Sequence, residues 1–209
     1  LIHMMSGRFS FTQEAFETFL STRSEPAWLV ELRRRAWQTF SELPMPDRQQ
    51  EEWRRTDIRG FRLDKFAPPS AEGANGQVAK PTLTEGVELA GSTVACDSRQ
   101  SQCCVEPSLA QRGVLFGSLD ELVRDHGALI EPWLFTRAVN PAYDKFAALH
   151  AAFWSGGSLL YVPKGVVIER PLHVLSAMSP GGVDLGHSLI VLEDGAEATV
   201  LAETASSNP

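Results

Sequence analysis

The sequence predicts an α+β protein in which a helical N-terminal region precedes a β-rich region of stacked coils. Apolar residues recur at helical spacing near the start of the chain, whereas after Gly157 short runs follow the two-residue period of strands. A block that begins at Ser158 also has a similar copy that begins at Ser188, 30 positions later. Repeats of this kind are typical of solenoids, although a jelly roll would give the same pattern.

Composition and charge exclude several classes of protein. The 209 residues are 43% hydrophobic and 22% charged, which is ordinary for a globular protein. The net charge of −7 argues against general nucleic-acid binding. No apolar run approaches the ~20 residues that a membrane helix needs. The three cysteines, two of them adjacent, do not suggest a disulfide framework, so a reducing cytoplasm fits best.

Helices are expected first over 11–23 and 26–43, where large apolar side chains fall on one helix face. Ser24 is a suitable N-cap for the second of them, because its hydroxyl would accept a free backbone N–H. Two more helices are expected, one after the capping-box pattern that begins at Ser118 and one from Asn140.

The remaining elements are strands and a linker. Strands are expected over 87–89, 93–95, 159–162, 166–168, 172–175, 189–192 and 198–201. The predicted regions are a helical region over 1–66, a flexible linker over 67–86, a mixed region with two helices over 87–156 and the start of the coil stack over 157–209. The Gly- and Ala-rich residues 70–80 are expected to be poorly ordered.

Stacking of the two repeat copies makes a specific prediction about four side chains. Leu160 and Val162 should share one interior column with Ile190 and Leu192. The last coil has no successor before Pro209, so we expect the native protein to continue beyond this residue. Its open edge would favour a homodimer or a larger oligomer.

No set of residues forms a recognisable active site, so the sequence assigns no catalytic, cofactor-binding or metal-binding residue. The cysteines are Cys96, Cys103 and Cys104, a spacing unlike the paired motifs of metal and cluster sites. Adjacent residues on a strand point to opposite faces, which disfavours a shared ion. We interpret all three as ordinary thiols.

Some residues in the β-rich region are of the kinds that bind metal in cupins, namely His173, His187, Glu193 and Glu203. The His-x-His pair typical of cupins is absent, so each histidine is interpreted as hydrogen-bonded to a neighbour. His126 and His150 are expected to pack on helix faces. A cupin-like jelly-roll metalloenzyme remains the alternative function. A β-helical carbohydrate-active enzyme would need clustered carboxylates, which the region after Gly157 lacks.

Arginines cluster at Arg33–Arg35 and Arg54–Arg55. Because charge runs on helices usually face solvent, we interpret both as solvated faces. Docking of a partner protein is the other possibility.

One segment has a more specific likeness. Residues 144–157, D-K-F-A-A-L-H-A-A-F-W-S-G-G, resemble the signature region of the SufB/SufD family of SUF iron–sulfur cluster assembly proteins. Residues 160–172 and 187–196 are similar to the family in the same order. Residues 51–57, E-E-W-R-R-T-D, resemble its N-terminal E-x-W-x-x-T-D element. The early position of this element is more like the SufD branch.

The resemblance implies a helical N-terminal domain followed by a right-handed parallel β-helix and then a C-terminal helical domain. It implies a scaffold subunit, not an enzyme, that works in the cytoplasm with SufB-like and SufC-like subunits. The iron–sulfur cluster would be handled by the full complex and not by these residues. The family's implicated cysteine and histidine have no matching positions here, so none is transferred.

Overall fold

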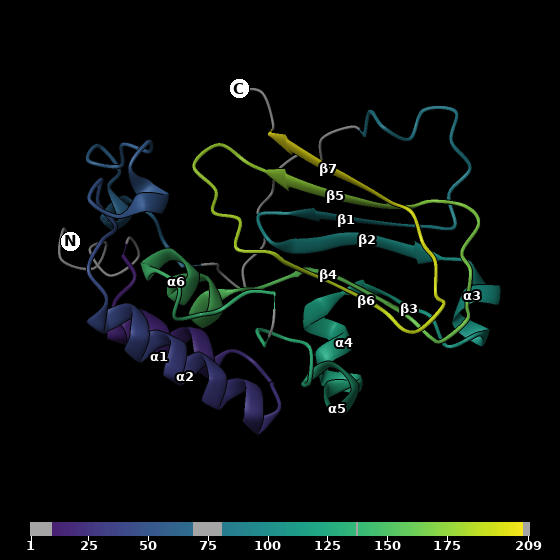
Figure 1. Cartoon of the computed structure of the whole chain (residues 1–209), viewed down its shortest axis with the longest axis horizontal. Helices are drawn as coiled ribbons and strands as arrows, with labels where there is room; N and C mark the ends of the chain where they lie inside the picture. Colours follow the sequence, from purple (N-terminus) through teal and green to yellow (C-terminus); the bar gives the residue numbers. More distant parts are fainter. Residues whose placement is uncertain (1–9, 69–80, 137, 207–209) are drawn as a thin grey trace, which may run out of the picture. The chain divides into compact units, whose positions relative to one another are not determined.

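A computed structural model describes residues 10–68, 81–136 and 138–206 (Figure 1). The chain divides into two units that are not consecutive in sequence. The helical unit comprises Leu1–Ala71 and Phe135–Trp154, and the β unit comprises Glu72–Leu134 and Ser155–Pro209. The division therefore differs from four consecutive regions, since residues 135–154 belong with the first helices. The poorly ordered segment predicted over 70–80 lies outside the described residues.

The helical unit contains α1 (Gln13–Ser21), α2 (Ala27–Glu42) and α6 (Lys145–Phe153), with the short 3-10 helices η2 (Glu51–Trp53) and η3 (Leu63–Lys65). The hydroxyl of Thr12 caps α1 by accepting the Ala15 N–H at 3.2 Å. Pro26 occupies the N-cap position of α2 and no side chain caps this helix. The expectation that Ser24 caps α2 is therefore wrong. Pro lacks an N–H, so fewer donors at this end need a partner.

Helix α6 begins later than the predicted start at Asn140. The side-chain oxygen of Asn140 accepts the N–H of Ala142 at 2.9 Å, which forms a local turn instead of a helix. The carboxylate of Asp144 then accepts the Ala147 N–H at 2.7 Å and caps α6. Once begun, the helix is largely buried. It therefore lacks the polar face that marks a surface helix.

An aromatic cluster forms the core of the helical unit. The ring of Phe153 lies 5.0–5.6 Å from the rings of Phe11, Phe16, Phe19 and Trp37. Most of these rings meet edge to face, the arrangement that their quadrupoles favour. The cluster joins α1 and α2 to α6, which explains why a segment far along the chain belongs to this unit.

Arg33 is also part of this core, so its interpretation as part of a solvated face is wrong. Its side chain is fully buried. The Nε atom donates to Glu25 at 2.7 Å, and Nη1 donates to the carbonyl of Ala152 at 3.0 Å. The guanidinium also lies 4.6 Å from the ring of Trp154. Arg34 and Arg35 do face outward, with side chains 49% and 71% exposed, and Arg54–Arg55 are exposed as expected.

The β unit has two mixed sheets. One has the order β2-β1-β5-β7 and the other β3-β4-β6. The strands are β1 (Gly91–Cys96), β2 (Arg99–Val105), β3 (Leu115–Ser118), β4 (Gly157–Val162), β5 (Leu172–Met178), β6 (His187–Leu192) and β7 (Val200–Ser206). Three short helices accompany them: α3 (Pro107–Gln111), α4 (Leu119–Asp125) and α5 (Gly127–Ile130).

The start of α4 partly matches the capping-box pattern. Ser118 occupies the N-cap position, as expected, but its side chain makes no capping hydrogen bond. Across the described parts of the chain, no helix has the length and apolar character needed to cross a membrane.

Parallel pairing connects the two repeat copies. Strands β4 and β6 pair in parallel with Leu160 opposite Ile190 and Val162 opposite Leu192, the 30-residue offset seen in the sequence. Strand β5 pairs in parallel with β1 on one side and β7 on the other. The prediction that these four side chains share one column is therefore confirmed for the register of β4 and β6. The right-handed parallel β-helix stays a prediction.

Burial within this column is uneven. Leu160 is 2% exposed and Val162 is fully buried, whereas Ile190 is 53% and Leu192 45% exposed. Among the described strands, β6 and β7 are the last of their sheets, so each has a neighbour on one side only. The expected interior position thus holds for the first copy and not for the second.

Two of the predicted strands are not present as strands. Residues 87–89 precede β1 and belong to no strand. The partner of β1 is instead β2, and the hairpin that they form turns at Asp97 and Ser98. Both turn residues have positive φ, 48° and 67°, as a two-residue hairpin turn of type I′ requires. Residues 166–168 contribute only an isolated bridge between Val167 and Glu197. The core that these elements enclose contains Ala90, Leu109, Val114, Phe116, Leu160, Val162, Val166, Ile168 and Leu172.

Candidate functional site

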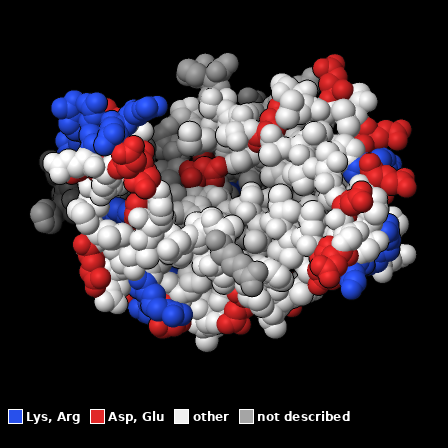
Figure 2. Space-filling view, in the orientation of Figure 1, with Lys and Arg blue, Asp and Glu red and all other residues white. Residues whose placement is uncertain are grey.

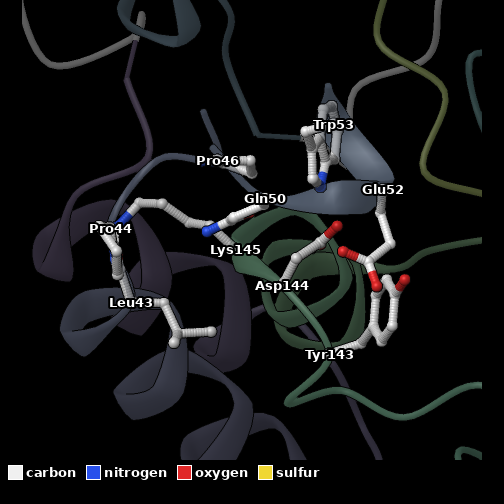
Figure 3. Close-up of a pocket in the computed structure, with 9 residues that line it drawn as sticks. All are labelled: Leu43, Pro44, Pro46, Gln50, Glu52, Trp53, Tyr143, Asp144 and Lys145. Atoms are coloured by element: carbon white, nitrogen blue, oxygen red, sulfur yellow. Dashed lines mark hydrogen bonds between the residues drawn. The ribbon is translucent and has the colours of Figure 1, made fainter. Parts of the chain in front are cut away.

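Two of the segments that resemble the SufB/SufD family, 51–57 and 144–157, meet in the helical unit. Trp53 of η2 lies with its ring 5.4 Å from that of Phe146 in α6. Beside this contact is a pocket of about 160 Å³ (Figure 3). Its lining residues are Leu43, Pro44, Pro46, Gln50, Glu52, Trp53, Tyr143, Asp144 and Lys145. The fold thus brings residues about 90 positions apart into one small site.

Lys145 connects two helices beside this pocket. Its Nζ atom donates to the carbonyls of Phe40 and Leu43 at 2.6 and 2.7 Å. It also lies 4.3 Å from the centroid of the Phe40 ring. These carbonyls are at the end of α2, where a cation is favoured by the helix dipole. Burial lowers the pKa of Lys145. The lysine therefore joins the end of α2 to the start of α6.

The remaining polar groups of the pocket are acidic. Glu52 and Asp144 line it together with the rings of Trp53 and Tyr143. One oxygen of Asp144 is occupied by the α6 cap, and Tyr143 is 62% exposed. Carboxylates beside aromatic faces attract cationic groups. The pocket has no nucleophile next to a base, so its geometry suits binding and not catalysis.

A second polar cluster crosses the sheet of the β unit. His173 is 1% exposed, with Nδ1 3.1 Å from Ser92 Oγ and Nε2 3.1 Å from Glu203 Oε2. Glu203 also accepts hydrogen bonds from the backbone N–H of Thr82 at 2.7 Å and from its hydroxyl. The bonds from Thr82, with a smaller contribution from His173, lower the pKa of Glu203 to about 2.

The direction of one hydrogen bond follows from the charge of Glu203. An ionised carboxylate is an acceptor only, so Glu203 accepts a hydrogen bond from His173 Nε2. The Ser92 hydroxyl is the partner of His173 Nδ1. A hydroxyl, imidazole and carboxylate in this order also occur in nucleophilic catalysis. Here the buried imidazole links β1, β5 and β7. The interpretation of His173 as satisfied by its neighbours is confirmed.

The four cupin-type residues are not brought together. His173 lies in β5 and bonds Glu203 of β7, whereas His187 begins β6 in the other sheet. Glu193 accepts hydrogen bonds from the Tyr161 hydroxyl at 2.7 Å and the Lys164 N–H at 2.9 Å. Within the described residues, no three His, Cys, Asp or Glu side chains are grouped as metal ligands.

Two further histidines lie in or beside helices. His126 stands where α4 ends and α5 begins. His150 lies in α6 with its ring 5.9 Å from that of Phe135. The packing expected for His150 is therefore confirmed.

The cysteines lie on the β1–β2 hairpin. Cys96 is buried, whereas Cys103 and Cys104 are exposed, and all three are free thiols. Desolvation of the sulfur atom raises the pKa of Cys96 and also that of Cys103, whose Sγ atom is partly covered near the carbonyl of Phe116 although the residue as a whole is exposed. A protonated thiol is a poor metal ligand and a poor nucleophile. The interpretation of these two as ordinary thiols therefore agrees with their surroundings.

A hydroxyl-lined cavity of about 140 Å³ lies between the two sheets. Asp184 is its one carboxylate, and Oδ1 accepts the Ser98 hydroxyl and the Gly186 N–H, each at 2.8 Å. The Ser176 hydroxyl donates to the other oxygen. Sequence reasoning missed this cavity and the part that Ser92 plays beside His173. The 30-residue offset between His173 and Glu203 was the available signal for the second.

The comparisons with known proteins agree with the resemblance. Residues 92–174, from β1 into β5, match the family model described as SufBD protein N-terminal region. The chain belongs to the SufB/SufD family of iron–sulfur cluster assembly proteins. Within this family it is most like SufD.

Individual relatives support this placement. The chain is 30% identical over 207 residues to the iron–sulfur cluster assembly protein SufD of Bacillus subtilis, covering 97% of this chain and 47% of that protein. It is 28% identical over 177 residues to SufB of the same organism, covering 77% and 36%. A SufBD family protein of Staphylococcus haemolyticus is 26% identical over 201 residues, covering 88% and 42%. The chain thus spans less than half the length of each of these relatives.

Proposed function

We propose that this chain is part of a SufD-like scaffold subunit of the SUF machinery, which assists iron–sulfur cluster assembly together with a SufB-like subunit and a SufC-like ATPase. The observation that carries the proposal is the similarity to SufD over 97% of the chain. The subunit positions partners and is not itself an enzyme. The cluster is substrate of the complex and is not held by this chain alone.

The described residues fit such a role. The pocket beside Trp53 and Lys145 suits recognition of a partner group better than chemistry. The one hydroxyl–imidazole–carboxylate cluster described above is buried and fastens strands together. Three free thiols suit the reducing cytoplasm, where we place the protein.

The fold supports the same proposal. We infer that the parallel pairs β4–β6 and β5–β7 are the first coils of a right-handed parallel β-helix. A jelly roll is built from antiparallel strands. The parallel pairs therefore favour the scaffold over the cupin-like metalloenzyme. No observation on the described residues supports that metalloenzyme.

Co-purification tests the proposed partners. The native protein that carries this chain would be tagged, isolated from its own cells under reducing conditions and analysed by mass spectrometry. The expected result is recovery of a SufB-like and a SufC-like subunit in near-equal amounts. A matched variant with Arg33→Ala, which removes a buried contact of the helical unit, shows whether recovery depends on the folded chain. Isolation of the folded protein without either subunit would refute the proposal.

A further inference from the structure

The helical unit contains a groove of about 510 Å³ next to η2. Two turns form its sides, one beginning at Met45 and the other ending at Phe61. Met45 is 39% and Phe61 40% exposed, and Ile58 lies between them half-buried. Large apolar side chains that converge on one hollow at the surface mark a binding site more often than scattered ones do.

The apolar wall of this groove is held in place. The ring of Phe61 stacks on Phe66 at 5.6 Å, with an angle of 18° between the planes. It also meets the ring of Phe146 edge to face at 5.7 Å. A ring fixed from two sides loses little conformational entropy when a ligand covers its remaining face.

Two arginines, Arg48 and Arg59, line the groove. Arg48 lines it, and its Nε atom donates to the carbonyl of Arg54 at 3.2 Å, which orients the guanidinium. Among the described residues, no carboxylate pairs with Arg48 or Arg55 within 4.0 Å. Figure 2 shows Lys and Arg side chains gathered over this part of the helical unit.

The carboxylates of the groove are already occupied. Asp57 forms a two-pronged pair with Arg59, with distances of 3.0 and 2.7 Å. The hydrogen bonds from Arg59 hold the pKa of Asp57 far below its ordinary range. Asp47 accepts the Gln49 N–H at 2.8 Å. Arg48 adds a smaller electrostatic contribution to the lowered pKa of Asp57 but forms no ion pair with it, so its guanidinium can still bind a ligand carboxylate.

We infer that this groove binds an acidic peptide segment of a partner protein, with one large apolar side chain seated between Met45 and Phe61 and a flanking carboxylate on Arg48. Arginine binds carboxylates in a two-pronged geometry, which gives both affinity and orientation. The lining cations are Arg48 and Arg59, and Arg59 is paired with Asp57, so the groove offers too few cations for the phosphate backbone of a nucleic acid. The groove would bind such a segment whether or not the chain assembles with SUF subunits.

Fluorescence anisotropy tests this site. The probe is fluorescein-labelled Glu-Glu-Leu-Phe-Glu-Glu, titrated with the 209-residue chain at low and high salt. The expected result is saturable binding that weakens with salt, since exposed charges contribute to it. Met45→Asp and Arg48→Glu should each weaken binding at least about tenfold, because a few central residues dominate such sites.

Controls separate the site from general charge and from misfolding. Arg35→Glu on α2, whose side chain is 71% exposed, should bind the probe as the parent chain does. Circular dichroism melts would show that Met45→Asp stays folded. Absence of binding by the parent chain would overturn the site. So would binding by both groove variants as tight as that of the parent, or binding of a probe with lysine in place of glutamate as tight as that of the acidic probe. Tighter binding of labelled oligothymidylate would also overturn it.

Discussion

Leu160 and Ile190 lie opposite each other on neighbouring parallel strands, yet Leu160 is 2% exposed and Ile190 is 53% exposed. The same column of side chains is thus inside the protein at β4 and in water at β6. An edge strand also presents unpaired backbone N–H and C=O groups. Residues 171–209 contain no Lys or Arg, the side chains that commonly prevent such an edge from pairing with another strand.

We therefore expect the chain to self-associate through β6 and β7. Sedimentation velocity should show a dimer or larger species, more evident at high salt, where repulsion between Glu193, Asp194 and their copies is screened. Ile190→Lys should shift the population to monomer, whereas Val139→Lys in the helical unit should not. A monomer at every salt and protein concentration would contradict this expectation.

Arg33→Ala should destabilise the helical unit by about 3–5 kcal/mol, because Glu25 would then lie buried without its partner. Urea unfolding followed by tryptophan fluorescence measures the change. Arg34→Ala breaks an exposed pair with Glu17 and should leave the urea midpoint nearly unchanged. Equal midpoints for the two variants would show that Arg33 is not a core contact.

Acid should also weaken the contact of Arg33 with Glu25. Burial alone would raise the pKa of Glu25, but Arg33 and Arg23 outweigh it and hold this pKa below its ordinary value of 4.5. The stabilisation is therefore present above about pH 4.5 and lost as pH falls through the lowered pKa. The midpoints of parent and Arg33→Ala should accordingly approach each other in acid.

Glu203→Gln should lower the urea midpoint at neutral pH, because it weakens the bonds to His173 and Thr82. The pKa of Glu203 is lowered from 4.5 to about 2, so its contribution is present above pH 4.5 and disappears as pH falls toward 2. The difference between parent and variant should shrink over that range. Glu197→Gln, on an exposed side chain, serves as control. A difference that does not change with pH would mean that the charge of Glu203 is unimportant.

Two glycines with similar backbone angles should respond differently to alanine. Gly157 has φ of 80°, and a Cβ atom there would lie 2.1 Å from the carbonyl oxygen of His187. Gly165 has φ of 70° but open space around it. Gly165→Ala should cost about 1–2 kcal/mol from backbone strain alone. Gly157→Ala should cost more or prevent folding, as judged by soluble yield and melting. Similar effects at both sites would contradict the close contact.

The isolated chain should bind no iron–sulfur cluster. Cys96 points into the protein, and adjacent Cys103 and Cys104 occupy opposite faces of β2. Anaerobic reconstitution with iron and sulfide, followed by visible absorption and iron counting, measures this. A stable cluster near one per chain, lost in Cys103→Ala or Cys104→Ala, would overturn the interpretation of these thiols.

The periodicity of apolar residues predicted the helices and strands whose side chains follow a regular pattern along the chain. The repeat at Ser158 and Ser188 predicted their pairing, because identical turn lengths keep the register of successive strands. The hairpin turn at Asp97 and Ser98 was not predicted, since Asp is common at the first position of such a turn but Gly, not Ser, usually follows it. The burial of Arg33 was also missed, because it depends on α6, more than 100 residues away.

The candidate site was predictable only in part. The segments around Trp53 and Asp144 were recognised separately, but their meeting depends on tertiary packing. The sequence presented His173 as one of several possible ligands and gave no sign that Ser92 lies beside it. Which residues lie side by side depends on how the strands pair. Strand β1 pairs with β5, although Ser92 and His173 are 81 residues apart in the sequence.

The return of the chain to the helical unit at residues 135–154 sets an order of events during synthesis. The partners Arg33 and Ala152 are separated by 119 positions. At ~5–20 residues per second, the ribosome needs roughly 6–24 seconds to supply the second after the first. The aromatic face of α1 and α2 remains exposed to solvent during that interval, while the β1–β2 hairpin emerges from the ribosome. A nascent chain stalled before α6 should therefore recruit chaperones that bind exposed apolar surface, and release them once Phe153 has left the exit tunnel.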